Sequence, residues 1–200
     1  MTTKAGREKP ILFSGAMVRA ILAGNKTMTR RVVKASIHPD TKTINLTNLF
    51  GYAGFTGFYN DEVLFTKCPY GQVGSTLWVR ETLKYEPDYG WMYAAGPHDE
   101  INDKYRDSIH GQLQNFSNRR VYCPSIHMPK AYSRITLDIT GVRVERLQQI
   151  TYDDAVAEGI DHEYPKAIVQ FKDLWESING AGSWDANPWV WVISFKRVKP

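Results

Sequence analysis

Short apolar runs bounded by turn residues recur along the chain, a pattern typical of β-strands. Apolar and polar positions alternate most clearly over residues 134–147, with Gly141 near the middle. The sequence predicts five main strands, at about 10–13, 29–34, 76–81, 134–147 and 189–195. The last of these is apolar enough to be buried on at least one side.

Three other segments have the period of amphipathic helices: 16–23, 151–159 and 166–179. The second begins at Thr151, with Asp154 placed three residues later as a partner in capping. The third carries four apolar side chains on one face: Phe171, Leu174, Trp175 and Ile178.

Two long stretches interrupt this order. Residues 35–67 are rich in Gly, Asn, Thr and Tyr and predict hairpins, whereas 84–129 are irregular apart from a short strand at 90–94. Residues 102–118 are too polar to assign. Two hundred residues suit a single domain, 1–200. The element order predicts an α+β fold: a small mixed β-barrel flanked by helices, with two long insertions.

Composition is that of a folded protein with a slightly basic surface: 42% of residues are apolar and the formal net charge is +4. Six tryptophans and eleven tyrosines exceed what packing requires, although Trp78, Trp189 and Trp191 are expected in the core. Aromatic and basic side chains together permit a nucleic-acid or nucleotide partner.

The two cysteines, Cys68 and Cys123, cannot build a disulfide framework. With His127 they match no closed zinc-ligand spacing, so neither a metal nor another cofactor is predicted. No apolar stretch approaches the length of a membrane span, and the N-terminus lacks the apolar core of a signal peptide. We therefore expect a cytoplasmic protein without a membrane partner.

The most distinctive segment is the Gly-Asn-Lys-Thr-Met-Thr-Arg-Arg sequence that starts at Gly24, directly after the first helix. Gly24 suits the left-handed position that ends a helix. In the turn that follows, Lys26 and Thr29 can present their side chains to one spot, which a straight strand would prevent. Together with Arg30 and Arg31, these side chains would place an activated nucleophile beside an anion-binding surface. An ordinary solvated turn has the same spacing.

These motifs resemble the ASCH-domain family, a branch of the PUA-like β-barrel superfamily. Beside the Lys-Thr turn, the match includes Gly-x-x-Leu-x-Val from Gly74, Leu-x-x-Ile-Thr-x-x-x-Ala-x-x-Glu-Gly from Leu147 and the aromatic final strand. Together they cover about half of the chain. With its segment 125–129 the whole chain is similar to the larger ASCH proteins of phages and prophages, which implies the host cytoplasm.

Small bacterial N4-acetylcytidine amidohydrolases of this family use a lysine and a threonine in this turn and a glutamate in the later helix. The resemblance implies that Lys26, Thr29 and Glu158 are the corresponding residues. It implies removal of an acyl group from N4-acylated cytidine, as a nucleoside, nucleotide or RNA residue. This chain is about twice as long as those enzymes, and it carries Arg30 where they have an apolar residue.

Such chemistry needs an activated hydroxyl. Thr29 requires a base, and Lys26 serves as one only if neighbours and burial lower its pKa from about 10.4. A charged Lys26 would instead stabilise an oxyanion. Glu158 could protonate the departing amine or activate water, or it could be a solvated carboxylate at a helix end.

Other charged residues extend this candidate site. Arg80 and Glu81 follow a strand that should be buried, and they could line the same cleft or form a structural ion pair. His127 and Arg134 could bind a phosphate or a base edge, or lie on the surface. The predicted substrate-binding residues are Arg30, Arg31, Arg80, Glu81, His127 and Arg134.

Two other functions remain possible on these residues. PUA-like barrels commonly bind RNA, so a non-catalytic reader of RNA or modified nucleic acid would use Thr29 only as a hydrogen-bonding group. A ribonuclease ranks last, because the sequence offers neither a metal cluster nor a histidine pair. The expected partner is a modified cytidine nucleoside or nucleotide, or RNA, and no oligomeric state is predicted.

Overall fold

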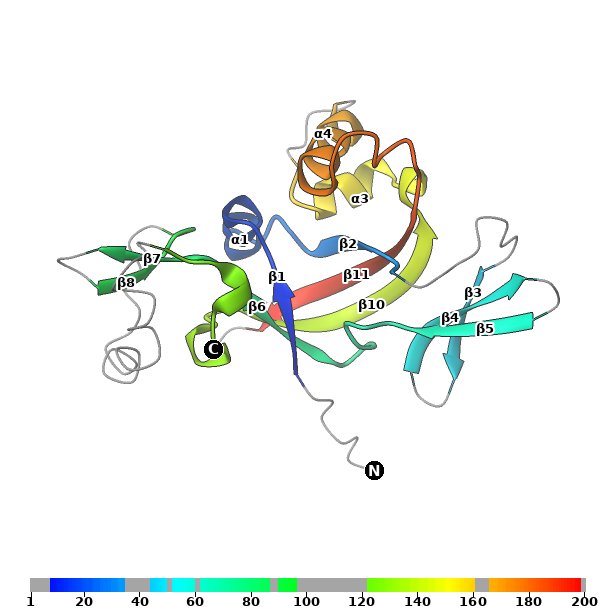
Figure 1. Ribbon diagram of the computed structural model, residues 1–200, viewed down its shortest axis with the longest axis horizontal. Helices are drawn as coiled ribbons and strands as arrows, with labels where there is room; N and C mark the ends of the chain where they lie inside the picture. The colour runs from blue at the N-terminus through cyan, green and yellow to red at the C-terminus, as the bar shows by residue number, and fades with distance from the viewer. Residues whose placement is uncertain are drawn as a thin grey trace.

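The computed structural model describes residues 8–34, 44–49, 52–59, 62–86, 90–96, 122–160 and 166–198. A five-stranded sheet forms the centre of the molecule, with helices packed against it (Figure 1). Its strands, in spatial order, are β1 (Lys9–Leu12), β6 (Thr76–Arg80), β10 (Thr136–Arg146), β11 (Trp189–Val198) and β2 (Met28–Val32). The predicted mixed α+β class is confirmed.

The sheet is antiparallel except for β1, which runs parallel to β6. Its longest pairing joins β10 to β11 along nearly their whole length, with a register shift between Ile139 and Gly141. The two halves of the alternating pattern at 134–147 therefore form one continuous strand, and the irregularity next to Gly141 absorbs the change of register.

The pairings leave β1 and β2 as the two edges of this sheet. Within the described segments these two strands do not pair with each other, so the sheet is open at that point. The closed barrel that the element order predicted is not confirmed.

The three predicted helices are present: α1 (Gly15–Leu22), α3 (Tyr152–Ala157) and α4 (Ala167–Asn179). The Ser14 side chain caps α1, and the hydroxyl of Thr151 accepts a hydrogen bond from the backbone N–H of Asp154 at 3.2 Å. Gly24 follows α1 with a φ of +83°, as its position predicted. None of the helices in these segments is long and apolar enough to cross a membrane.

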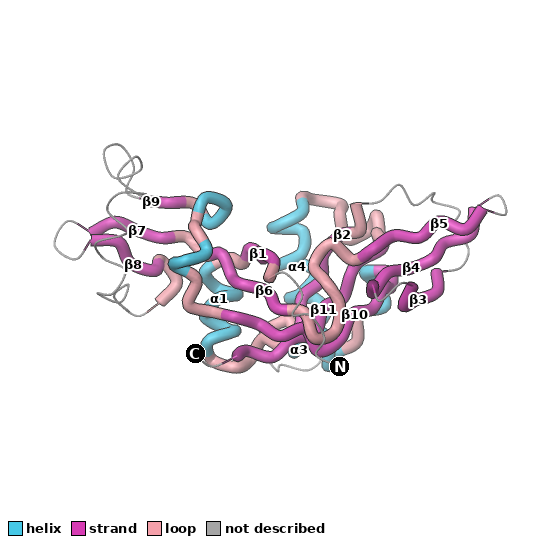
Figure 2. The backbone as a smooth tube through the Cα atoms, turned by 90° about the horizontal axis from the view of Figure 1, so that it is seen from below, coloured by secondary structure: helices cyan, strands magenta, loops and turns pink. Residues whose placement is uncertain are grey.

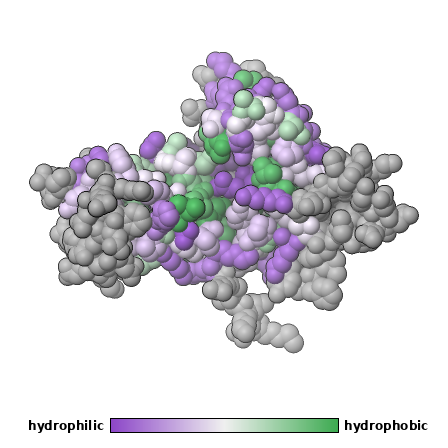
Figure 3. Space-filling view, in the orientation of Figure 1, coloured by the Kyte–Doolittle hydropathy of each residue, from purple (hydrophilic) through white to green (hydrophobic). Residues whose placement is uncertain are grey.

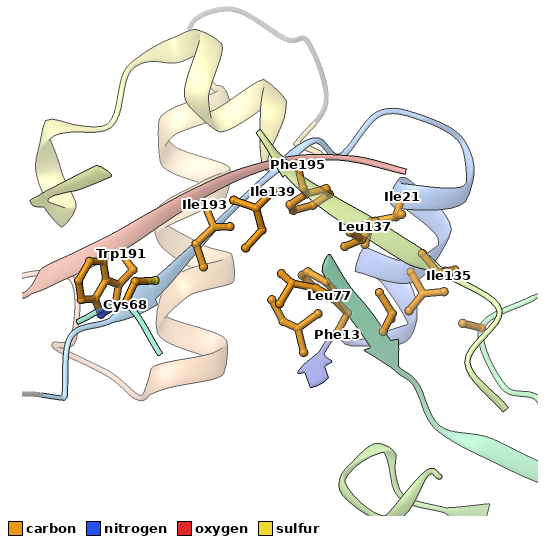
Figure 4. Close-up of a cluster of buried hydrophobic side chains, with 14 of the residues drawn as sticks. Phe13, Ile21, Cys68, Leu77, Ile135, Leu137, Ile139, Trp191, Ile193 and Phe195 are labelled. Atoms are coloured by element: carbon orange, nitrogen blue, oxygen red, sulfur yellow. The ribbon is translucent and has the colours of Figure 1, made fainter. Parts of the chain in front are cut away.

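The final strand, β11, is buried on both faces because alternate side chains pack against different helices. Trp191 and Ile193 share a core with Ile21 of α1 (Figure 4). Val190 and Val192 point the other way and pack against α3 and α4. The sheet thus has α1 on one face and the α3–α4 pair on the other, and β2 runs along the edge between them.

Two small sheets extend from opposite ends of the core (Figures 1 and 2). The first contains β3 (Ile44–Leu49), β4 (Tyr52–Tyr59) and β5 (Glu62–Lys67), which form antiparallel hairpins as predicted for this stretch. The second contains β7 (Leu83–Glu86), β8 (Gly90–Tyr93) and β9 (Tyr122–Cys123). The sequence predicted β8 but not β7. Residues 102–118, which the sequence left unassigned, lie outside the described segments.

Three 3-10 turns complete the described chain: η2 (Ser125–His127), η3 (Lys130–Tyr132) and η4 (Leu147–Gln149). The first two lead from β9 back to the core sheet. A second core of five buried residues lies under them: Leu83, Trp91, Cys123, Met128 and Tyr132. Both cysteines of the chain are buried and free.

Candidate active site

The end of α3 lies beside the segment that joins α1 to β2. Lys26 and Glu158 face each other in an isolated antiparallel bridge, and the N–H of Thr27 donates to the carbonyl oxygen of Ala157 at 2.8 Å. Gly159 makes this approach possible: its φ is +90°, and a Cβ there would lie 3.2 Å from the Cβ of Lys26. A larger residue would push the helix end away from the lysine.

In the part of the chain that the structure describes, Glu158 is the hydrogen-bond partner of the Lys26 amine. Its Nζ donates to the carboxylate Oε2 at 2.6 Å and to the carbonyl oxygen of the same residue at 2.8 Å. Burial lowers the pKa of Lys26; the carboxylate of Glu158 opposes this effect, and Arg31 and Arg30 add to it. Lys26 and Glu158 are therefore in direct contact, and burial shifts the amine toward its neutral form.

Arg30 is buried among three carboxylates. Its Nη2 donates to Glu145 at 2.6 Å and to Asp154 at 2.7 Å, and its Nη1 lies 3.4 Å from Oε1 of Glu158. Its guanidinium group lies against the ring of Phe171, with 5.8 Å to the centroid. Arg30 thus ties Glu158 to strand β10 and helix α3, and its charge is fully compensated inside the protein.

Arg143 completes this network. It donates to Glu145 at 2.8 Å and to Asp154 at 2.7 Å. Burial alone would raise the pKa of Asp154, but the hydrogen bond from Arg143 and the charge of Arg30 outweigh it and lower that pKa. Three cations thus face three carboxylates: Lys26, Arg30 and Arg143 against Glu145, Asp154 and Glu158.

A cleft of about 240 Å³ opens next to this network, between β2 and α4. Strand β2 contributes Thr29, Arg30, Arg31 and Val32. Helix α4 contributes the apolar face that the sequence predicted: Phe171, Leu174, Trp175 and Ile178. Hydrophilic and hydrophobic residues accordingly meet between the α3–α4 pair and the sheet (Figure 3). The cleft therefore has one polar wall and one apolar wall.

Two of the three predicted catalytic residues, Thr29 and Glu158, line this cleft. Thr29 is buried on β2, opposite Ile193 of β11. Lys26 does not line the cleft and reaches it through Glu158. The predicted turn ends earlier than expected, because β2 already begins at Met28.

Arg31 also lines the cleft, but its environment differs from that of Arg30. Its Nη2 donates to the carbonyl oxygen of Leu12 at 2.6 Å, and its guanidinium group lies 5.2 Å from the ring centroid of Phe13. Within the described segments no carboxylate is hydrogen-bonded to it. Burial lowers the pKa of Arg31, an effect that electrostatic interactions with Tyr70 and Glu158 partly oppose.

The remaining predicted binding residues do not line the cleft. Arg134 forms two hydrogen bonds of 2.9 Å with the buried carboxylate of Glu81. The guanidinium group of Arg80 stacks on Trp78, 4.7 Å from the ring centroid. His127 is exposed at the end of η2. Glu81 thus belongs to a structural ion pair, but its partner is Arg134 and not Arg80, which donates instead to the carbonyl oxygen of Ile126 at 3.1 Å.

Sequence reasoning missed the roles of Glu145, Arg143 and Asp154. Alternate residues of a strand share a face, so Arg143 and Glu145 could be placed together, but an exposed face was the natural assumption for them. The register sets Arg143 beside Val192 and Val192 beside Arg30, which brings the charges together across three strands. That long-range register carries no local sequence signal.

Comparison of the chain with protein-family models, curated proteins and solved structures gave no match. Within the described part of the chain, no group of three or more His, Cys, Asp or Glu side chains is placed to hold a metal ion.

Proposed function

We propose that this chain is an amidohydrolase that removes an acyl group from the exocyclic N4 amine of an acylated cytidine. We further propose that it belongs to the ASCH branch of the PUA-like superfamily, on the motifs that it shares with those proteins. The observation that carries the proposal is the buried Lys26–Glu158 pair, which lies against a cleft lined by Thr29.

The pair has the electrostatic properties of a base. Lys26 must be neutral to accept a proton, and its burial favours that form. Loss of its charge would ordinarily leave Glu158 as an unpaired buried carboxylate, which is costly. Here Arg30 supplies a second cation at 3.4 Å, so Glu158 keeps a partner when Lys26 is neutral.

The reaction then proceeds in two halves. The hydroxyl oxygen of Thr29 attacks the carbonyl carbon of the acyl group while its proton passes to the Lys26–Glu158 pair. The tetrahedral intermediate collapses, the C–N bond breaks, and the pair returns the proton to the departing N4 amine. Water next attacks the acylated threonine and gives a proton to the pair, which releases the carboxylic acid and restores the hydroxyl.

The two walls of the cleft suit a pyrimidine base. The flat face of the pyrimidine ring packs against the α4 face that includes Phe171 and Leu174, while the polar acyl amide meets the β2 wall at Thr29. At about 240 Å³ the cleft is smaller than the roughly 300–1,000 Å³ typical of pockets for drug-sized ligands. It therefore suits a single modified nucleoside or nucleotide.

The test is incubation of the purified protein with N4-acetylcytidine, with release of cytidine and acetate followed by chromatography. Release in equal amounts is the expected result. A reader of nucleic acid would give no release. It would instead bind an acetylcytidine-containing RNA with an affinity that falls steeply with salt, because its binding energy would come from phosphate contacts.

A further inference from the structure

We propose that the cleft contains a phosphate-binding site formed by Arg31 and Lys34, and that the protein therefore acts on a cytidine nucleotide in preference to the free nucleoside. The identity of the base rests on the proposed function. The phosphate site rests on separate observations about two basic side chains.

The charges that line the cleft are unequally compensated. Arg30 and Glu158 both line it, and both are neutralised within the network of three cations and three carboxylates. Arg31 and Lys34 line it as well, and within the described segments neither forms a hydrogen bond or an ion pair with a carboxylate. Arg31 and Lys34 therefore give this part of the cleft an excess of positive charge, which an anionic ligand would balance.

Arg31 is prepared for such a ligand. The carbonyl oxygen of Leu12, 2.6 Å from Nη2, and the ring of Phe13 fix the position of its guanidinium group. An arginine has five N–H donors in a planar fork, and this contact occupies only one of them. A partly buried charge without an anion is unfavourable, so a phosphate would improve its environment.

The position of Arg31 also agrees with a nucleotide. It lies two residues after Thr29 on β2, so both side chains project from the same face of the strand. Two residues of extended chain span about 7 Å, which keeps both groups within reach of a single nucleotide. Tyr70 also lines the cleft and adds a hydroxyl group to it.

Calorimetric titration with cytidine and with cytidine 5′-monophosphate tests the site without any need for turnover. The wild-type protein should bind the monophosphate about 10-fold or more tightly than cytidine. That ratio should fall toward one in Arg31→Gln/Lys34→Gln and stay unchanged in Lys196→Gln, which removes one exposed cation elsewhere. Arg31→Lys, which keeps the charge but loses the fork, should give an intermediate ratio and provides a milder change if the double variant does not fold.

Equal affinity for the two compounds in the wild-type protein, or no detectable binding of the monophosphate, would overturn the proposal. So would a ratio that survives in the double variant. A cytidine trinucleotide in the same titration separates a terminal phosphate from an internal one, and tighter binding of the trinucleotide would contradict a mononucleotide ligand.

Turnover separates this proposal from the proposed function. Equal kcat/KM values for N4-acetylcytidine and its 5′-monophosphate would refute the phosphate site and leave the amidohydrolase intact. Hydrolysis of neither compound, with the monophosphate still bound more tightly through Arg31, would refute the amidohydrolase and leave the phosphate site intact.

Discussion

The amine of Lys26 is bound by two oxygen atoms of one residue, the carboxylate and the carbonyl of Glu158, although 132 positions separate the two residues in the chain. Both contacts depend on the close approach of the end of α3 to the turn before β2, which Gly159 permits. The site is therefore assembled only when these two segments pack together, and its chemistry is coupled to the stability of the fold.

Replacement of Lys26 by methionine should destabilise the protein. Glu158 is buried, and loss of the amine leaves it with only the longer contact from Arg30, so the free energy of unfolding should fall by about 3–5 kcal/mol. Urea denaturation measures the loss. The double variant Lys26→Met/Glu158→Gln should recover part of it, because the buried charge is also removed; a double variant no more stable than the single one would contradict this account.

The rate of hydrolysis should rise with pH through the lowered pKa of Lys26. Only the neutral amine accepts a proton, and burial favours that form, so the rise should occur below 10.5, the ordinary pKa of lysine. The measurement is kcat/KM as a function of pH. Lys26→Arg keeps a cation that does not titrate in this range and should be inactive; a Lys26→Arg variant with the wild-type profile would exclude Lys26 as the base.

Protonation of Asp154 should make the protein less stable in acid. Its pKa is lower in the folded state than the ordinary value of 3.8, so the folded protein binds fewer protons there than the unfolded chain. The stabilisation from Asp154 is complete above that value and is lost as the pH falls through the folded-state pKa. The difference in unfolding free energy between wild type and Asp154→Asn should therefore shrink below about pH 4, and a constant difference would contradict the prediction.

Arg134 should contribute to stability and not to catalysis. Its paired hydrogen bonds neutralise Glu81, which is buried away from the cleft, so Arg134→Gln should lower the free energy of unfolding by about 3 kcal/mol. The values of kcat and KM should stay within about twofold of wild type at a temperature where the variant is folded. A tenfold increase in KM would show instead that Arg134 contacts substrate.

Much of the fold follows from local patterns in the sequence. The period of the apolar residues predicts α1, α4 and the core strands, and Gly24 marks the end of α1 at the residue where the backbone turns left-handed. Strand β7 was missed, because its four residues, Leu83–Glu86, alternate too briefly to stand out from the irregular segment around them. The closed barrel required a pairing between edges that no local pattern specifies.

The site was predictable only in part. Lys26, Thr29 and Glu158 were singled out together only by a resemblance to a family pattern, whereas the apolar face of α4 follows from helical spacing. The position of Asp154 after Thr151 indicated a role in capping, and its backbone N–H does make that bond. Its carboxylate, however, binds Arg30 and Arg143, because the fold brings β2 and β10 to the same side of α3. Such contacts depend on register and not on sequence distance.

The most direct test of the account compares cytidine release from N4-acetylcytidine by the wild type, Thr29→Ser and Thr29→Val. Valine matches threonine in shape and carries a methyl group in place of the hydroxyl, and matching thermal melts will show that the fold is intact. We expect release by the wild type, slower release by the serine variant, and a rate at least about 1,000-fold lower for the valine variant. Undiminished release by Thr29→Val, or none by the folded wild-type protein, would contradict the assignment of Thr29 as the nucleophile of an amidohydrolase.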